Sequence, residues 1–183
     1  MKALIGGRNY GQSTFNRILN MKRQVGSTFK PIVYTAAFRQ TDDSQGNVYT
    51  PAYPLLDQEW EWEYDQKKWK PNNYEKEHLG WISLRKALSH SINTTAARMA
   101  KRVGLSEVIE TAKLLGVNTN LTPIPSLSLG GVELSPIELL SVYCTFANHG
   151  ASDTPLVIRG ILNSDGSEYT KFEYHARPKL DPG

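Results

Sequence analysis

The sequence predicts an α+β fold, and two observations support this prediction. Strand and turn signals gather toward the two ends of the 183-residue chain, whereas helix signals dominate residues 83–150. Segregated helices and strands, in place of regular βαβ alternation, are typical of helices packed on an antiparallel sheet. We therefore expect a helical block against a sheet that collects both chain ends.

The composition is that of an ordinary globular domain. Hydrophobic residues make up 39% of the chain and charged residues 21%, and 183 residues are enough for one sizeable core. The net charge of +3 comes from scattered basic residues, so we expect a solvated surface and no nucleic-acid partner. No apolar run approaches the roughly 20 residues that a membrane-spanning helix needs, so we expect no membrane segment in this chain.

The chain begins with strand signals and then reaches its most informative stretch. Residues 1–7 and 15–19 predict two short strands joined by a polar turn. Ser27 and Lys30 then stand three positions apart, where a turn gives way to a helix over residues 31–39. Positions i and i+3 share a helix face, so the Lys30 amine can reach the Ser27 hydroxyl.

This pair can provide a nucleophile and its base. A serine hydroxyl is a weak nucleophile until a neighbouring base takes its proton, and lysine is such a base only when it is held neutral. The backbone N–H of Ser27, at a helix start, also suits an oxyanion. The alternative is that Ser27 caps the helix and Lys30 is solvated. Ser83 and Lys86 share the spacing, and there Ser83 predicts an ordinary N-cap.

Residues 48–80 predict a surface hairpin. Acidic and aromatic residues alternate over residues 59–64, and the lysine-rich residues 67–70 follow across Asp65-Gln66. The aromatic side chains could form a carbohydrate or nucleic-acid platform. We expect instead that they hold the hairpin on the body of the domain.

Helices and a second hairpin follow. Residues 83–90, 94–103 and 106–115 predict helices, and Ser135 with Glu138 forms a capping box that opens another helix ending near Gly150. Cys144, the only cysteine, is expected as a small core residue of that helix. Residues 156–162 and 167–174 predict a hairpin.

A second polar cluster, residues 89–95, lies between two predicted helices. Ser91 and Asn93 can both point into a cleft if their link is extended, where a hydroxyl relays protons and an amide orients a substrate. Either residue could instead cap the helix near residue 94. No metal site and no cofactor are expected, because no metal-ligand spacing connects the histidines with one another or with Cys144.

Several stretches together resemble the transpeptidase domain of class A, bifunctional penicillin-binding proteins. The first is Arg23-Gln24-Val25-Gly26-Ser27-Thr28-Phe29-Lys30-Pro31, which is similar to the active-serine motif of that family. The others agree in order and spacing, and they are residues 3–7 and 15–17, residues 70–74, residues 80–88 with Ser91-Ile92-Asn93, residues 125–130, residues 132–136 and residues 146–150. The resemblance covers nearly the whole chain.

The resemblance implies a partial serine β-lactamase-like and penicillin-binding fold and a peptidoglycan D,D-transpeptidase. Ser27 would be the nucleophile on D-Ala-D-Ala stem peptides, Lys30 its base, Ser91 a proton relay and Asn93 a substrate-binding residue. The backbone N–H of Ser27 would serve the oxyanion, and β-lactams would acylate Ser27. The implied location is the extracytoplasmic side of the bacterial inner membrane.

One departure limits this expectation. The family's third motif, Lys-Thr-Gly or Lys-Ser-Gly, occurs nowhere in the sequence. We therefore expect residues 1–183 to be a partial transpeptidase domain, cut at both ends and inactive alone. Its partners would then include the rest of its polypeptide, namely a glycosyltransferase domain and the second half of the transpeptidase domain. The alternatives are a non-catalytic scaffold of the same fold, or a D,D-carboxypeptidase or β-lactamase.

Overall fold

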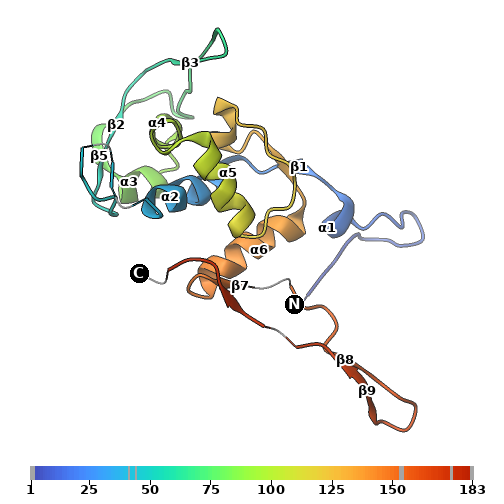
Figure 1. Cartoon of the computed structure of the whole chain (residues 1–183). Coiled ribbons are helices and arrows are strands. Elements are labelled where there is room, and N and C mark those ends of the chain that lie inside the picture. Colours follow the sequence, from blue (N-terminus) through green and yellow to red (C-terminus); the bar gives the residue numbers. More distant parts are fainter. Residues whose placement is uncertain (1–2, 41, 44, 153–154, 174, 182–183) are drawn as a thin grey trace. The chain divides into compact units, whose positions relative to one another are not determined.

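The computed structural model describes residues 3–181 except residues 41, 44, 153–154 and 174. It is an α+β structure, as predicted, and its elements are labelled in Figure 1. The helices are α1 (Arg17–Asn20), α2 (Lys30–Phe38), α3 (Leu84–Ser89), α4 (Asn93–Val103), α5 (Leu105–Leu114) and α6 (Pro136–Ala147), with 3₁₀ helices η1 (Gly26–Phe29) and η2 (Pro125–Leu129). The strands are β1 (Arg23–Gln24), β2 (Pro54–Asp57), β3 (Trp62–Tyr64), β4 (Lys67–Trp69), β5 (Gly80–Ser83), β6 (Glu133–Leu134), β7 (Ala151–Ser152), β8 (Gly160–Leu162), β9 (Glu168–Lys171) and β10 (Arg177–Pro178).

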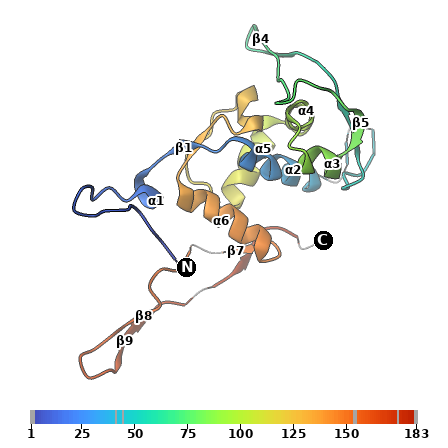
Figure 2. The same cartoon turned by 180° about the vertical axis from the view of Figure 1, so that it is seen from behind.

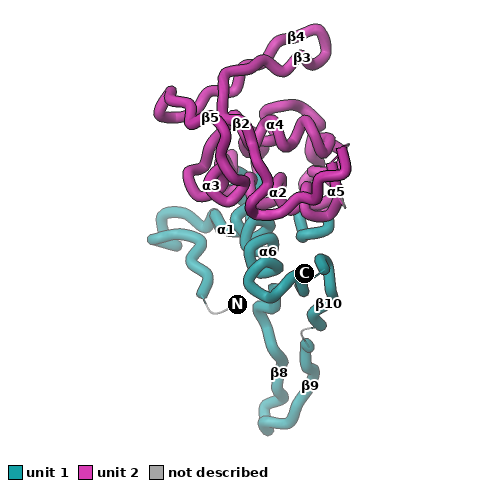
Figure 3. The backbone as a smooth tube through the Cα atoms, turned by 90° about the vertical axis from the view of Figure 1, so that its left-hand side faces the viewer, with its two compact units in different colours: residues 1–22, 114–118, 134–183 teal, residues 23–113, 119–133 magenta. Residues whose placement is uncertain are grey.

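The chain divides into two compact units (Figure 3). Unit 2, magenta in Figure 3, comprises residues 23–113 and 119–133 and holds α2, α3 and α4 with the 3₁₀ helices η1 and η2. Unit 1, teal, comprises residues 1–22, 114–118 and 134–183 and holds α1, α6 and the strands β7–β10.

The core of unit 2 lies between α2 and α4, which pack side by side (Figures 1 and 2). Ile32, Val33 and Ala36 of α2 and Ala96 and Ala100 of α4 are fully buried. Small alanines on α4 let the two helices approach closely, so that side chains at their N-terminal ends can meet. That end of α4 carries the predicted cluster of Ser91 and Asn93.

Antiparallel strand pairs support this core. β2 pairs with β5, with Leu55 opposite Ile82 and Asp57 opposite Gly80. Asp57 is fully buried although it is charged, so it needs hydrogen-bond partners inside the protein. The pair β2–β5 therefore places a carboxylate next to the N-terminal end of α4, since Thr94 Oγ1 donates to Asp57 Oδ1 at 2.5 Å.

The predicted acidic and basic hairpin is confirmed as β3–β4. Glu63 pairs with Lys68, and the turn residues Asp65 and Gln66 both have positive φ, as a two-residue hairpin turn requires. Trp60, just before β3, lies under the Arg98 guanidinium at 4.8 Å from the ring centroid. This cation–π contact with α4 confirms that aromatic side chains hold the hairpin on the body.

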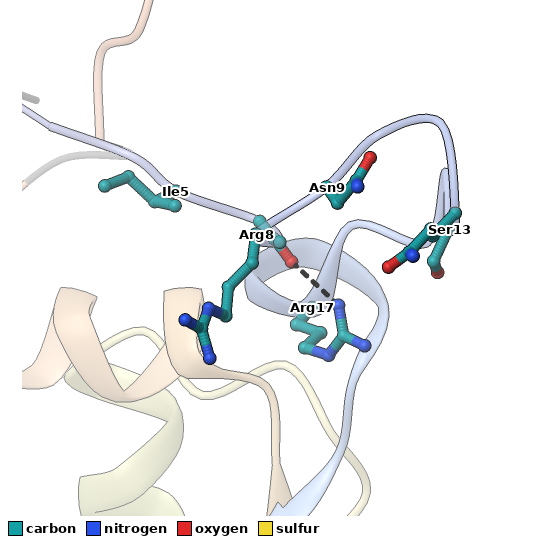
Figure 4. Close-up of a pocket in the computed structure, with 8 residues that line it drawn as sticks. Ile5, Arg8, Asn9, Ser13 and Arg17 are labelled. Atoms are coloured by element: carbon teal, nitrogen blue, oxygen red, sulfur yellow. Dashed lines mark hydrogen bonds between the residues drawn. The ribbon is translucent and has the colours of Figure 1, made fainter.

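The prediction of strands at residues 1–7 and 15–19 is wrong for residues 3–7 and 15–19, which the structure describes. Residues 3–7 form no strand, and residues 17–20 form the short helix α1. Asn16 explains the difference, because its side chain accepts from the N–H groups of Ile18 and Leu19 and so caps a helical turn. Arg17 donates from its backbone N–H and its side chain to the Gly6 carbonyl, which folds the loop back on itself (Figure 4).

In unit 1, α6 begins with the predicted capping box. The Ser135 hydroxyl accepts from the Glu138 N–H, and the Glu138 carboxylate accepts from the Ser135 N–H. Val142 and Thr145 form the buried face of α6. Cys144 lies on another face and is exposed, so its prediction as a core residue is wrong.

The predicted C-terminal hairpin is confirmed as the antiparallel pair β8–β9, and Figure 2 shows the turn that joins the two strands. A second pair, β7 with β10, follows α6. Each of these pairs is a separate two-stranded sheet, and none includes the described residues 3–22. The expectation that one sheet collects both chain ends is therefore wrong in this structure.

Candidate active site

Ser27 lies inside η1, the 3₁₀ helix that runs directly into α2. Its side chain is exposed, whereas Phe29 and Lys30 behind it are fully buried. The N-cap of η1 is Val25, which has no side-chain capping bond, and the N-cap of α2 is Phe29. Ser27 therefore caps neither helix, and the alternative interpretation of this serine is wrong. Ser83, by contrast, is the N-cap of α3, as predicted.

A close backbone contact holds the start of η1. The Gly26 N–H donates to the Gly130 carbonyl at 3.1 Å, and the Val25 N–H donates to the Val132 carbonyl at 3.1 Å. A Cβ on Gly130, whose φ is +72°, would lie 2.0 Å from the Gly26 carbonyl oxygen. Only glycine fits there, so the loop after η2 fixes the backbone immediately before Ser27. This role of Gly130 was not predicted from the sequence.

Lys30 is the fully buried cation of the site. Its Nζ donates to the Ser91 carbonyl at 2.5 Å, to Ser91 Oγ at 3.0 Å and to Asn93 Oδ1 at 2.6 Å. The structure thus brings together Lys30, Ser91 and Asn93, which were predicted from two separate stretches of sequence. The interpretation of Lys30 as a solvated first-turn residue is wrong.

Burial sets the protonation of this amine. It lowers the pKa of Lys30 from 10.5 to about 8, because removal from water disfavours the charged form. The three oxygen acceptors favour the ammonium, but burial outweighs them. At neutral pH the amine is then neutral in about a tenth of the molecules, a fraction useful to a general base.

Ser91 and Asn93 lie where α3 passes into α4. Ser91 has a φ of +52°, which is unusual for a residue with a side chain and costs on the order of 1 kcal/mol or more. Its N–H donates to the Leu88 carbonyl at 2.9 Å, and Asn93 is the first residue of α4. The N-cap of α4 is Ile92, so neither Ser91 nor Asn93 is the helix cap.

A polar network that was not predicted from the sequence supports this corner. The buried Asp57 accepts hydrogen bonds from Thr94, Asn73 and the Leu79 N–H, and it also lies against His78. The sequence did contain a signal for this network. Asp57 is a charged residue at the end of a hydrophobic strand, and Asn72 and Asn73 follow in a loop that contains Pro71. Spacing along the chain did not show that these groups meet.

A pocket of about 650 Å³ joins Ser27 to this corner. Its walls come from η1, from the loop before β5 and from the α3–α4 link. The lining residues are Ser27, Asn73, Tyr74, Glu75, Glu77, Leu79, His90, Ser91, Ile92 and Asn93.

The arrangement suits acyl transfer at Ser27. The exposed Ser27 hydroxyl lies on the same pocket as Ser91 and Asn93, and the buried Lys30 amine, whose pKa is lowered, bonds to both of these residues from behind the pocket wall. Among the residues that the structure describes, Lys30 bonds to Ser91 and Asn93 rather than to Ser27. Catalytic hydrogen bonds commonly tighten only when substrate binds, so this geometry is compatible with proton transfer through Lys30 or Ser91.

Comparison with curated proteins points to one kind of relative. The chain is 37% identical to penicillin-binding protein 1A of Aquifex aeolicus over 169 residues, which is 91% of this chain and 22% of the relative. It is 32% identical to penicillin-binding protein 1B of Vibrio cholerae, covering 91% of this chain and 21% of that protein. The chain thus spans about a fifth of the length of these relatives.

Solved structures agree with the sequence comparison. The crystal structure of penicillin-binding protein 1A from Haemophilus influenzae matches with a TM-score of 0.84 at 28% identity, over 94% of this chain and 25% of that one. The imipenem acyl-enzyme complex of penicillin-binding protein A from Mycobacterium tuberculosis shares the fold, with a TM-score of 0.78 at 20% identity over 97% of this chain and 44% of that one.

The family match extends over almost the entire sequence. The profile of the family described as "Penicillin binding protein transpeptidase domain" matches residues 3–181. The fold, the relatives and this match agree with the resemblance stated from the motifs. The chain belongs to the penicillin-binding protein transpeptidase domain family.

Proposed function

We propose that this chain is part of a peptidoglycan D,D-transpeptidase that works through a serine acyl-enzyme. One observation carries the proposal: the buried Lys30 amine bonds to Ser91 and Asn93 beside the pocket on which Ser27 is exposed. A nucleophile and a hydroxyl relay on one pocket, with a base of lowered pKa bonded to that relay, are the parts that acyl transfer requires.

The proposed reaction begins on the donor stem peptide. Ser27 Oγ attacks the carbonyl carbon between the two D-alanines, and its proton passes to Lys30. The N–H of Ser27 lies in the first turn of η1, where backbone donors have no partner within the helix, and it would donate to the oxyanion. The C–N bond then breaks, and the proton reaches the departing D-alanine through Ser91.

The second half of the reaction transfers the acyl group. An amine of a neighbouring stem peptide attacks the ester on Ser27, forms the cross-linking amide and restores the hydroxyl. Asn93 would orient the donor amide, since its side chain lines the pocket beside Ser91. A β-lactam would enter the first half of the same reaction and remain on Ser27 as an ester.

The substrates imply a location. Peptidoglycan is assembled outside the cytoplasm, so we propose that the complete protein works in the bacterial cell envelope. In the part of the chain that the structure describes, no helix is long and apolar enough to cross a membrane. The proposed partners are stem peptides, β-lactams and the remainder of the polypeptide, including a glycosyltransferase domain and the strand that bears the third motif.

The test uses the complete polypeptide encoded by the gene. It is incubated with a stem peptide ending in D-Ala-D-Ala and an amine acceptor, and released D-alanine and the cross-linked peptide are measured by mass spectrometry. We expect both products, and we expect Ser27→Ala to abolish both.

Ser83→Ala is the matched control, because Ser83 shares the Ser-x-x-Lys spacing but caps α3. It should retain both products. Release of D-alanine without cross-linking would indicate a carboxypeptidase instead. No release by the unaltered protein would favour the non-catalytic scaffold and contradict the proposal.

A further inference from the structure

Asp57 is a buried carboxylate that the proposed chemistry does not use. It lies at the end of β2 and is fully buried. Burial alone would raise its pKa, but hydrogen bonds from Thr94, the Leu79 N–H, Asn73 and His78 prevail and hold the pKa below the ordinary value. Asp57 is therefore a charged anchor that collects several donors from different segments.

Asn73 connects this anchor to the active-site helix. Its Nδ2 donates to Asp57 Oδ1 at 2.8 Å and to the Glu77 carbonyl at 2.9 Å. Its Oδ1 accepts from the N–H of Asn93 at 3.0 Å and from the N–H of Thr94 at 3.2 Å. Asn73 is 7% exposed, so these bonds lie away from bulk water.

The bonds from Asn73 take the place of a missing helix cap. The first N–H groups of a helix have no partner within the helix, and a polar residue at the N-cap normally accepts from them. In α4 the N-cap is Ile92, whose apolar side chain cannot do so. Asn73, some 20 positions earlier in the chain, supplies the oxygen.

The same loop fixes the side chain of Asn93. Its Nδ2 donates to the Asn72 carbonyl at 2.7 Å, so the amide oxygen faces the other way, toward Lys30 Nζ at 2.6 Å. A carbonyl acceptor at Nδ2 and an ammonium donor at Oδ1 allow one amide orientation only. The loop of Asn72 and Asn73 thus determines which Asn93 atom Lys30 meets.

We propose that Asp57 and Asn73 are positioning residues for the reaction at Ser27: Asp57 holds Asn73, and Asn73 holds the start of α4 so that Asn93 accepts from the Lys30 amine. The inference rests on the proposed function and extends it to residues that do not act on the substrate. An acceptor on the ammonium favours the charged form, so a displaced Asn93 would make Lys30 a weaker base that loses its proton at lower pH.

Other charged groups face this network and must be considered. His78 lies 3.1 Å from Asp57, and the Arg98 guanidinium interacts electrostatically with Asp57. Glu75, Glu77 and His90 line the pocket. A substitution at Asn73 leaves all of these charged groups in place and removes only the bonds of Asn73 itself, including those to the N–H groups of α4, to Asp57 and to the Glu77 carbonyl.

The test measures the second-order rate constant for acylation of the complete polypeptide by benzylpenicillin between pH 6 and 10. The variants are Asn73→Ala and, as control, Asn120→Ala, an exposed asparagine of the same unit. Circular dichroism establishes that each variant is folded. We expect Asn73→Ala to slow acylation about tenfold or more, because small displacements of catalytic groups are costly.

We also expect the midpoint of the acidic limb of the pH profile to move to lower pH, by about half a unit or more, in Asn73→Ala. Asn120→Ala should change neither quantity. A folded Asn73→Ala with the original rate would overturn the proposal. A slower rate with an unmoved limb would overturn it too, since a purely structural defect lowers the rate at every pH alike.

Two further arms keep the test decisive. If Asn73→Ala does not fold, Asn73→Ser is compared in its place, because one hydroxyl on a shorter side chain can accept from a helix N–H but cannot keep the bond to Asp57 and both bonds to α4. The same two changes, smaller in size, are then expected, and a folded Asn73→Ser with the original rate and pH profile would overturn the proposal. Failure of the proposed function is recognised separately, as an unaltered protein that is not acylated or a Ser27→Ala variant that is.

Discussion

At the residue scale, the character of the site depends on the environment of Lys30. A lysine in the first turn of a helix is ordinarily solvated and charged. Here the side chain is fully buried, and burial lowers its pKa to about 8. Because only the neutral amine accepts a proton, acylation of Ser27 should accelerate as the pH is raised through about 8 and level off above it.

Lys30→Arg tests this role while retaining a positive charge. The guanidinium stays protonated throughout the accessible pH range, so it cannot act as a base. We expect the acylation rate constant for benzylpenicillin to fall by about 10²–10⁴-fold. A variant that is acylated at an unchanged rate would show that Lys30 is not the base.

Single residues also mark the limit of sequence-based prediction. Ser27, Lys30, Ser91 and Asn93 were predicted because several motifs together agree in order and spacing with one family, although the Ser-x-x-Lys spacing alone also fits Ser83. Three of the four residues line the pocket, and Lys30 bonds to Ser91 and Asn93. The prediction for Cys144 failed because it rested on an apolar run alone, which does not tell which face of α6 is covered. Burial is decided by packing between elements distant in sequence.

At the element scale, the 3₁₀ helix that carries Ser27 is held by backbone contact with the loop after η2. Gly130→Ala would place a methyl group 2.0 Å from the Gly26 carbonyl oxygen, so the backbone before Ser27 must shift. We expect this variant to lose most of its acylation by benzylpenicillin, as measured by covalent labelling.

Gly46→Ala is the control for backbone strain. Gly46 also has a positive φ, +80°, but a Cβ there would meet nothing within 4 Å. Both variants carry the strain of a left-handed residue, about 1–2 kcal/mol, whereas only Gly130→Ala disturbs the site. Equal labelling of the two variants would contradict the proposed effect of Gly130 on Ser27.

The capping box of α6 makes a separate prediction. Removing the hydroxyl with Ser135→Ala costs the helix start about 1 kcal/mol, so its first-turn amides should exchange with solvent about fivefold faster. Hydrogen-exchange mass spectrometry of α6 measures this. Exposed Cys144→Ala on the same helix should leave the exchange unchanged, and a Ser135→Ala variant with unaltered protection would refute the stabilising role of the cap.

Helices and strands that are specified by a turn or cap within their own sequence were predictable. Elements whose ends depend on residues distant in the sequence were not. The hairpin β3–β4 and the helix α6 follow from a turn and a capping box within their own sequences. Residues 15–19 look strand-like, but Asn16 caps a helical turn there. The start of α4 is capped by Asn73, a contact that no local pattern reveals.

At the scale of the whole molecule, we propose that the chain carries part of a site. Lys-[Ser/Thr]-Gly is absent from the sequence, and the chain spans about a fifth of the length of its curated relatives. We propose that the polypeptide following residue 183 supplies this motif on a strand. Sequencing the gene downstream should find it in frame, and an open reading frame without it would favour the non-catalytic scaffold.

The central claim is that Ser27 is the nucleophile of a penicillin-sensitive transpeptidase. It is tested most directly by incubating the complete polypeptide with benzylpenicillin and mapping the modified peptide by mass spectrometry. We predict a mass gain of one penicilloyl group on the peptide containing Ser27, and none in Ser27→Ala. A penicilloyl group on any other residue, or its persistence in Ser27→Ala, would contradict the claim.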